Sequence, residues 1–327
     1  MSPVPILSTN GYIGVGKQVS FGTPVAPTVG LFTKYLSESL ANEQEEIKGV
    51  EGGQGRYMIE SYKSLNRAGG DIAFYGRPDI IGFFLNAVLG NDAYSVGVPS
   101  VHVITPTVPK VITIERGIDP ATPLLIERFQ DCYVSDLTIE GEASNPVKVT
   151  ASLKGTKGVV QVAASTPSYE TNAPFFFFDT PTYTIDGGAT AVISKYSMKI
   201  SNNIDEWFGS AITPTEIIEK LLTIELSFTV KFETVAHYKK VYYGAGVDIV
   251  NTIADGSFRA QMTYGAGATL RSLDLYIKHI KHIRAPVNLD GSAATIMQDC
   301  EGYAVKVGAD NLIDVEVKNT FAADYDA

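Results

Sequence analysis

The sequence predicts a mainly β protein made of two tandem antiparallel β-sandwich domains, each with one short α-helix. Three observations lead to this fold class: most of the chain alternates apolar and polar residues, few segments have helical periodicity, and one order of elements occurs in both halves. Alternation buries one face of each strand and leaves the other wet, which favours antiparallel sheets. With 327 residues, 45% hydrophobic and 19% charged, the chain can form two domains with a substantial core.

The strands are expected where Val, Ile, Thr, Phe and Tyr alternate with polar residues between Gly, Pro, Asn or Asp. The segments that fit are 69–76, 110–117, 133–143, 146–155, 196–203, 222–233, 272–283 and 311–319.

Two short helices are expected, one in each half. "RPDIIGFFLNAVLG" (77–90) has Pro78 near its first position, an apolar stripe, and Gly90 placed to end it. "TVAHYKKVYYG" (234–244) is similar, with Thr234 as its N-cap and a glycine at its end. Each helix follows directly on a strand, which is the first sign of a repeat.

A second correspondence between the halves lies downstream of the helices. "QDCYVSDLTIEGEASNPVKVTASLK" begins at Gln130 and "QDCEGYAVKVGADNLIDVEVK" begins at Gln298, with apolar residues matched at alternating positions. We interpret this as a β-hairpin present in both halves of a duplicated chain. The polar, Pro-containing stretch 162–174 then separates a first domain, residues 1–165, from a second, residues 166–327.

Charge and cysteine content exclude several classes of protein. The net charge of -10 argues against a general nucleic-acid binder, which needs Lys and Arg to displace counterions. Two cysteines, Cys132 and Cys300, do not form a disulfide framework and are expected to be small buried strand residues at matching positions of the repeat. The chain start lacks the basic region of a signal peptide, and no apolar run approaches the ~20 residues of a membrane span, so no membrane anchor is expected.

The stretch "NGYIGVGKQVSFGTP" (10–24) resembles a phosphate-binding loop in its glycine spacing and Lys17. Such a loop needs Ser or Thr after the lysine and a helix to follow. Gln18 follows instead, and Pro24 and Pro27 exclude a helix. We therefore expect no nucleotide site, and glycines that relieve crowding in an extended N-terminal segment.

No cofactor, metal ion or catalytic site is predicted, so the protein is not expected to be an enzyme. His279 and His282 are three apart in a predicted strand and should point to opposite faces. His102 and His237 have no acidic or cysteine neighbours in sequence, and no nucleophile-elbow motif occurs.

The segment 41–68 is expected to be a long loop, acidic at its start and then glycine-rich and basic. It is interpreted either as a solvated loop or as an extended arm that becomes ordered against a neighbouring copy. The charged residues that would serve such an arm are Glu43, Glu45, Glu46, Arg56 and Arg67.

The sequence resembles the tail tube (major tail) proteins of long, flexible-tailed bacteriophages across nearly its whole length. The most specific match is "YIGVGKQVSFGTPVAPT" (12–28), the characteristic opening of one branch of that family. The other matching segments are "SESL" (37–40), "GDIAF" (70–74), "IIGFFLNAVLG" (80–90), "DCYVSDLTIEGEASNPVKVTASLKG" (131–155), "KISNNID" (199–205) and "GYAVKVGADNLIDVEVKN" (302–319).

This resemblance implies β-sandwich domains whose inner sheets join those of neighbours into a ring-shaped barrel. Rings built from six such domains stack into a hollow tube through which phage DNA reaches the host. Two domains in one chain would then require three chains per ring, with pseudo-sixfold symmetry. The implied location is the virion tail, assembled in the host cytoplasm, and the implied partners are other copies of the chain, the tape measure protein and the tail terminator.

A channel that passes DNA without gripping it should be acidic or neutral, which agrees with the net charge. The candidate acids facing the lumen are Asp71, Glu140, Glu225 and Glu316. The alternatives are another tail component of the same fold, either a tail terminator or a type VI secretion-like tube protein, and a β-rich carbohydrate-binding or hydrolytic protein.

Overall fold

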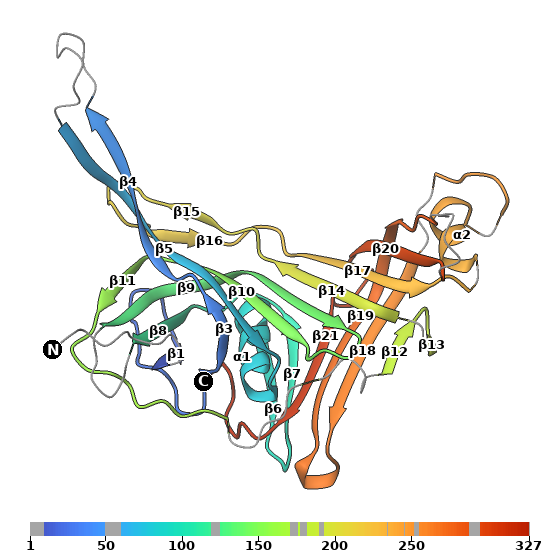
Figure 1. The fold of residues 1–327 in the computed structure, drawn as a ribbon, viewed down its shortest axis with the longest axis horizontal. Helices are drawn as coiled ribbons and strands as arrows, with labels where there is room; N and C mark the ends of the chain where they lie inside the picture. The colour runs from blue at the N-terminus through green and yellow to red at the C-terminus, as the bar shows by residue number, and fades with distance from the viewer. Residues whose placement is uncertain are drawn as a thin grey trace.

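The computed structural model is mainly β, as predicted, with its strands arranged along one long axis (Figure 1). It describes residues 10–49, 60–118, 125–170, 176, 182–189, 193–233, 235–244, 246–251, 255–287 and 295–326.

The first half of the chain contains one helix and eleven strands in the described residues. In chain order they are β1 (Gly11–Lys17), β2 (Phe32–Thr33), β3 (Tyr35–Glu38), β4 (Ala41–Gly49), β5 (Glu60–Tyr75), α1 (Pro78–Leu89), β6 (Gly90–Ser95), β7 (Ser100–Pro106), β8 (Ile112–Ile118), β9 (Leu125–Glu142), β10 (Lys148–Gly155) and β11 (Lys157–Val160).

The second half contains a short α-helix and ten strands in the described residues. They are β12 (Thr182–Ile185), β13 (Gly188–Ala189), β14 (Ile193–Ser201), β15 (Asp205–Trp207), β16 (Glu216–Ile218), β17 (Thr223–Lys231), α2 (Ala236–Tyr242), β18 (Asp255–Tyr264), β19 (Arg271–Arg284), β20 (Met297–Ala304) and β21 (Asp314–Asn319). A single 3-10 turn, Gly267–Thr269, separates β18 from β19.

The long strands form where the sequence alternates. In β10 every second side chain is buried, and Val149 and Leu153 belong to the hydrophobic core. Strand β9 behaves in the same way over its second half, where Leu137 and Ile139 are fully buried. Burial of one face of each strand explains the antiparallel pairing that the sequence predicted.

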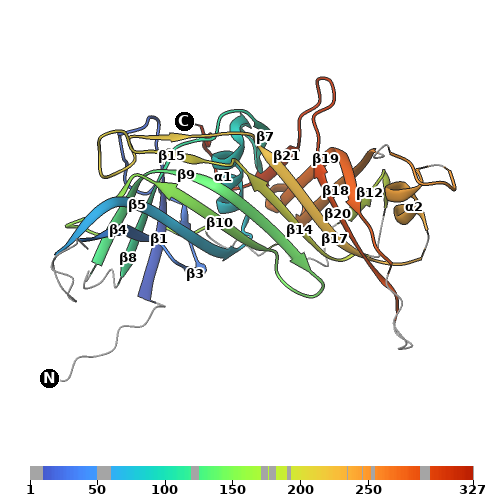
Figure 2. The ribbon, with the colours of Figure 1, turned by 90° about the horizontal axis from the view of Figure 1, so that it is seen from above.

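One continuous antiparallel sheet runs through both halves in the order β5–β10–β9–β14–β17–β20–β19. The join between the halves is the pairing of β9 with β14, over seven residues of each strand (Figure 1). Figure 2 shows the same strands from above, crossing the middle of the molecule side by side. Over the described residues of one chain, this sheet is open and does not close into a barrel.

The same set of strand pairings occurs twice along the chain. In the first half β3 and β4 pair with β5, β5 with β10, and β1 with β8. In the second half β14 pairs with β17, β17 with β20, and β12 with β18.

The longest strand of each half joins two sheets. In β9, residues 125–130 pair with β8 and β11, while residues 133–142 pair with β10 and β14. In β19, residues between 271 and 281 pair with β18 and residues 272–276 with β21, while residues between 280 and 284 pair with β20. Strands β9, β10 and β11 therefore correspond in pairing to β19, β20 and β21.

The predicted second β-hairpin, at 298–319, is wrong. Among the described residues β20 and β21 do not pair with each other; both pair with β19, at different points along it. The shared "QDC" triplet misaligned the halves, because Cys132 lies on β9 whereas Cys300 lies on β20. The two cysteines are therefore not at matching positions, although both are buried and free, as expected.

The predicted loop at 41–68 is also wrong in its described part. Strand β4 and the first half of β5 form an antiparallel β-hairpin that projects from the body of the protein (Figure 1). All residues of β4 between its two ends are exposed. Backbone pairing, rather than burial, gives this segment its structure.

Both predicted helices form, but their environments differ. Helix α1 is buried at every position and ends at Gly90, whose φ of 110° favours glycine. Helix α2 has no buried residue; Val235 occupies its N-cap, and the predicted cap Thr234 lies outside the described residues.

Two elements tie the halves together beyond the continuous sheet. Strand β7 of the first half pairs with β21 of the second. Residues after β21 return to α1, where the Tyr325 hydroxyl donates a hydrogen bond to the Asp79 carbonyl oxygen, 2.9 Å away. Glu170 accepts a hydrogen bond from the Asp79 amide at 3.0 Å.

Candidate functional site

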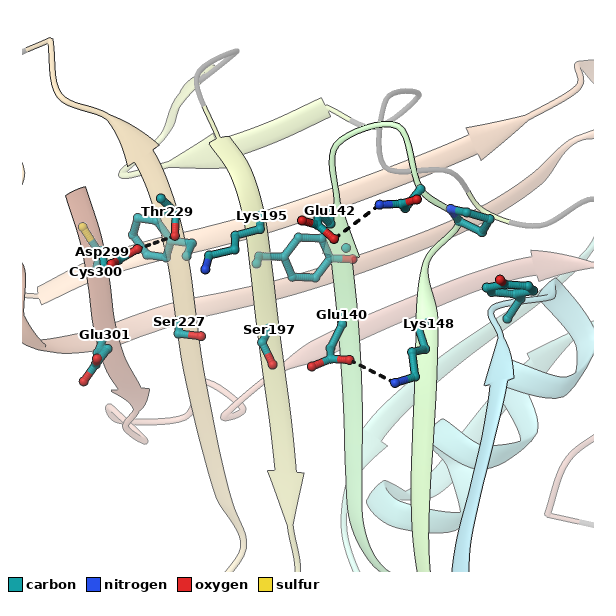
Figure 3. Close-up of a pocket in the computed structure, with 16 residues that line it drawn as sticks. Glu140, Glu142, Lys148, Lys195, Ser197, Ser227, Thr229, Asp299, Cys300 and Glu301 are labelled. Carbon is teal, nitrogen blue, oxygen red and sulfur yellow. Dashed lines mark hydrogen bonds and ion pairs between the residues drawn. The ribbon is translucent and has the colours of Figure 1, made fainter. Parts of the chain in front are cut away.

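The continuous sheet has an exposed face that carries polar side chains on several neighbouring strands. One row of facing residues crosses five strands, and Figure 3 shows its members side by side. The row runs Lys148, Glu140, Ser197, Ser227, Glu301. The alternate residues Ile139, Met198 and Leu226 point into the core beneath it.

A parallel row lies two residues further along the same strands. It consists of Thr138, Lys199, Glu225 and Tyr303. The sequence places small hydroxyl side chains and charged side chains at these positions, so the exposed face is polar on every strand of both rows. We take this face as the candidate functional surface, because its polarity is repeated from strand to strand across both halves.

The face is hollowed rather than flat. A cavity of about 590 Å³ lies over β9, β14, β17 and β20, and Figure 3 shows residues that line it. A neighbouring hollow of about 970 Å³ continues along β14, β17 and β20. Both are lined by Ser197, Ser227 and Glu301, so together they form one concave surface. We call this surface the concave face.

Positive and negative side chains alternate on the concave face. Glu140 lies 3.8 Å from Lys148, and Lys199 lies 3.1 Å from Asp136, measured between charged atoms. The charged positions of this face include the acids Asp71, Asp136, Glu140, Glu225 and Glu301 and the bases Lys148, Lys195, Lys199, Lys281 and Arg284. The surface is therefore mixed in charge rather than strongly acidic.

Three of the four acids predicted to face the lumen lie on the concave face. Asp71 on β5, Glu140 on β9 and Glu225 on β17 are all exposed there. Glu316 is placed elsewhere: it lies on β21, opposite Asp274 of β19, in the sheet that β19 forms with β18 and β21. The structure does not bring Glu316 together with the other three.

The seam between the halves has its own polar contacts on the concave face. The Ser201 hydroxyl of β14 donates a hydrogen bond to Asp136 of β9 at 2.6 Å. Burial alone would raise the pKa of Asp136, but the contacts with Ser201 and Lys199 outweigh it and lower that pKa. The carboxylate is therefore held in its charged form at the join.

The charged residues predicted for an arm lie on the projecting hairpin, and several contact one another. Arg67 on β5 forms an ion pair with Glu45 on β4, and Glu43 is opposite Arg67 in the strand register. Ser61 donates a hydrogen bond to Glu46 at 2.5 Å. Arg56 lies outside the described residues.

The β15–β16 ribbon lies along this hairpin and was not predicted (Figure 1). Arg67 pairs with Glu206 of the ribbon at 3.0 Å and lies over the Phe208 ring, 5.1 Å from its centroid. The Asn66 amide donates to the Ile212 carbonyl oxygen at 2.6 Å. By strand pairing the ribbon occupies the place in the second half that the β4–β5 hairpin occupies in the first.

The glycine-rich opening is strand β1, not a phosphate cradle. A Cβ on Gly14 would lie 2.7 Å from Pro27, and one on Gly16 would lie 2.7 Å from the carbonyl oxygen of Ala26. Residues 25–28 pack back against β1, and the Thr28 amide donates to the Val15 carbonyl oxygen at 2.8 Å. The prediction that these glycines relieve crowding is confirmed.

One buried polar cluster beside β1 was not found from the sequence. Glu115 is fully buried and accepts hydrogen bonds from the Tyr12 hydroxyl at 2.7 Å and from Arg128 at 2.6 Å. Its partners are far apart in the sequence, so no local pattern could reveal them. The cluster ties β1 to β8 and β9.

The histidines occupy separate environments. His279 contacts Asp310 at 3.1 Å, whereas His282 is buried edge-on against Phe228, with ring centroids 6.1 Å apart. In the part of the chain that the structure describes, no group of three or more His, Cys, Asp or Glu is placed to hold a metal ion. Over the same residues, no helix has the length and apolarity to cross a bilayer.

The fold and the candidate site define a mainly β protein built around one continuous antiparallel sheet with a polar exposed face. The chain matches the family model of the phage tail tube protein over residues 8–304, and it therefore belongs to that family. A search of curated proteins found no match. As a member of a structural, generally non-enzymatic family, the chain is a component of the bacteriophage tail, and the family implies assembly of many copies into a tube.

Proposed function

We propose that three copies of the chain form a ring with pseudo-sixfold symmetry and that stacked rings form the hollow tail tube through which phage DNA is delivered. The observation that carries this proposal is the repeated set of strand pairings joined at β9 and β14. Each half supplies one four-strand unit, β3/β4–β5–β10–β9 or β14–β17–β20–β19, to a single continuous sheet.

The proposal treats the halves as two tandem domains, residues 1–165 and 166–327. The repeat supports this division, because β11 ends at Val160 and β12 begins at Thr182, between the two sets of pairings. Strand β7 and the residues after β21 cross the boundary, so the domains are tied together and act as a rigid pair.

Ring closure follows from the open edges of the continuous sheet. At one end β3 and β4 pair with β5, and in the described residues no strand pairs with their other edge. At the other end residues 282–284 of β19 pair only with β20. In the repeat β9 corresponds to β19, and β14 corresponds to β3 and β4. Because β9 pairs with β14 inside the chain, β19 of one copy would pair with β3 and β4 of the next. Closing the ring protects these edges.

The concave face would then line the lumen. DNA phosphates are gripped by clusters of Lys and Arg, which release counterions. On the concave face the bases are interspersed with acids and hydroxyl groups, as in the Glu140–Lys148 and Asp136–Lys199 pairs. Such a surface is hydrated and offers DNA no continuous cationic track.

The β4–β5 hairpin and the β15–β16 ribbon would form the contact between stacked rings. Both project from the sheet at the same end and carry exposed apolar side chains, including Ile47, Tyr62 and Trp207. Because Arg67 is already held by Glu45 and Glu206, we assign this arginine to stiffening the arm rather than to contacting the next ring.

The tape measure protein inside the tube and a tail terminator at its end are the further partners that this function requires. A terminator of the same fold, or a type VI secretion-like tube protein, is the second candidate. A carbohydrate-binding or hydrolytic protein is less well supported, because the acids of the concave face alternate with lysines instead of converging in one groove.

Electron microscopy of the purified protein tests the proposal. Long hollow filaments built from stacked rings are expected. A chain that stays monomeric at all concentrations, or that caps preformed tubes without extending them, would contradict it.

A further inference from the structure

The two helices of the chain are equivalent in the repeat but differ completely in burial. All twelve residues of α1 are buried, whereas no residue of α2 is buried. Both helices follow the corresponding strands, β5 and β17, and both contact the long strand of their own half, β9 or β19. Part of this difference comes from the elements that cover α1 and not α2 in the described residues.

Helix α1 is covered by β6 and β7 of its own half and also by the second half of the chain. Helix α1 contacts β21 and β19, and the β6–β7 hairpin that follows α1 pairs with β21 through β7. The counterpart of β21 in the first half is β11, and the counterpart of β19 is β9. In a ring of identical copies, β11 and β9 of the next copy would therefore lie against α2, as β21 and β19 lie against α1.

Exposed apolar side chains lie both beside α2 and at the end of β11. Next to α2, Val247 and Ile249 are each 82% exposed. At the end of β11, Val160 is 65% exposed and Val162 is fully exposed. Valine and isoleucine at such exposure are typical of a contact surface when they occur together.

We propose that α2 and residues 246–251 of one copy dock on β11 and residues 160–162 of the next copy, and that this contact locks the ring. The inference rests on the proposed tube function, which it deepens by naming the subunit interface. Each surface is covered by a second copy of this chain, because the contact of α1 with β21 and β19 inside the chain is the template for the contact between copies.

The positions of the two surfaces suit such a contact. Strand β11 and helix α2 lie at opposite ends of the long axis of the molecule (Figure 1). Two different surfaces at opposite ends make a head-to-tail contact, which closes into a ring when the rotation per copy divides a full turn. A self-complementary dimer would need one surface on both partners.

The test uses two double variants and a matched control. Val247→Asp with Ile249→Asp changes the α2 surface, and Val160→Asp with Val162→Asp changes the β11 surface. Val29→Asp with Val96→Asp is the control, because these side chains are 78% and 86% exposed and lie at neither surface. Circular dichroism and thermal unfolding establish that each variant is folded, and native mass spectrometry counts the copies per ring.

For each surface variant, we expect the protein concentration needed to form closed rings to rise about tenfold. The control should form rings at the wild-type concentration. Mixing the two surface variants is expected to give heterodimers that do not close, because one intact α2 surface can still meet one intact β11 surface. Closed rings at the wild-type concentration from either surface variant would overturn the inference while leaving the tube function standing. Failure of the wild-type chain itself to form rings would instead overturn the proposed function.

Discussion

The Asp136 carboxylate of β9 accepts a hydrogen bond from the Ser201 hydroxyl of β14, 2.6 Å away, across the seam between the two halves. Lys199 of β14 lies 3.1 Å from the same carboxylate. Two strands more than fifty residues apart are thereby fixed in register on the concave face. The proposed pairing of β19 with β3 and β4 of the next copy follows the pattern of this β9–β14 pairing.

Asp136→Ala should destabilise the seam. The variant loses a charged hydrogen bond and an ion pair that is partly exposed, so we expect the free energy of unfolding to fall by about 1–2 kcal/mol. Urea unfolding measures the change. Glu225→Ala, an exposed acid on the same face, serves as the control and should alter stability little. Equal stabilities for the two variants would show that the Asp136 contacts do not support the join.

Glu170 should make stability fall as pH rises. Burial, together with the nearby Asp79 carboxylate, raises the pKa of Glu170 to about 8 from 4.5, and its Oε1 atom has no hydrogen-bond partner. The folded state therefore holds a proton that the unfolded state releases. Its stabilising effect is complete below about pH 4.5 and is lost progressively up to about pH 8.

Glu170→Gln should remove this dependence while keeping an oxygen to accept the Asp79 amide hydrogen bond. Thermal unfolding of the variant and wild type should give similar midpoints at acidic pH and a higher midpoint for the variant above neutrality. Glu216→Gln on β16 is a matched control on a strand residue that is exposed. A variant less stable than wild type at alkaline pH would contradict the protonated state of Glu170.

Reversing charge on the concave face should slow DNA delivery. Glu140→Lys with Glu225→Lys adds bases beside Lys148 and Lys199, which creates the cationic track that attracts phosphates. Phage particles assembled with this variant should eject DNA several-fold more slowly. Glu316→Lys is the internal control, since Glu316 lies on β21, between β19 and β7 and away from the concave face. Equal ejection rates for both variants would argue against a lumen lined by the concave face.

Shortening the arm should stop ring stacking without unfolding the domains. Residues 45–65 are replaced by an Asn-Gly turn, because Gln44 and Asn66 are opposite each other in the hairpin and a two-residue turn can join them. Residues beyond this point are kept, since Ala68 is buried. Electron microscopy should show single rings in place of filaments. Filaments of normal length would rule out the arm as the contact between rings.

Much of the fold could be predicted because alternation is a local property. The pattern in "PVKVTASLKG" predicts a strand with one wet face, and β10 has one. Pro78 and the apolar stripe likewise predict α1. The glycine crowding around Gly14 and Gly16 followed from local backbone arguments as well.

The choice of strand partners could not be predicted in the same way. Alternation assigns a face to each residue of β20 and β21 but does not say that both strands pair with β19. The three-residue match at Gln130 and Gln298 therefore misled the alignment of the halves. The repeat becomes clear only from the strand pairings of the structure, whose order does not depend on sequence similarity.

The surface assignments show the same limit. Asp71, Glu140 and Glu225 share the concave face because their strands are neighbours in the order β5–β10–β9–β14–β17, whereas Glu316 has the same strand pattern on β21, which pairs with β19 and β7. The β4–β5 hairpin looked like a loop because almost none of β4 is buried. Its strand structure depends on the facing half of β5, which sequence polarity does not reveal.

The most direct test of the account is the rotational symmetry and copy number of one ring in an assembled tube. Cryo-electron microscopy of the tube should show three copies per ring, with six similar sheet units around the lumen and alternating β9–β14 and β19–β3/β4 joins. A ring of six copies, or a ring in which β9 and β14 do not lie at the lumen, would contradict it.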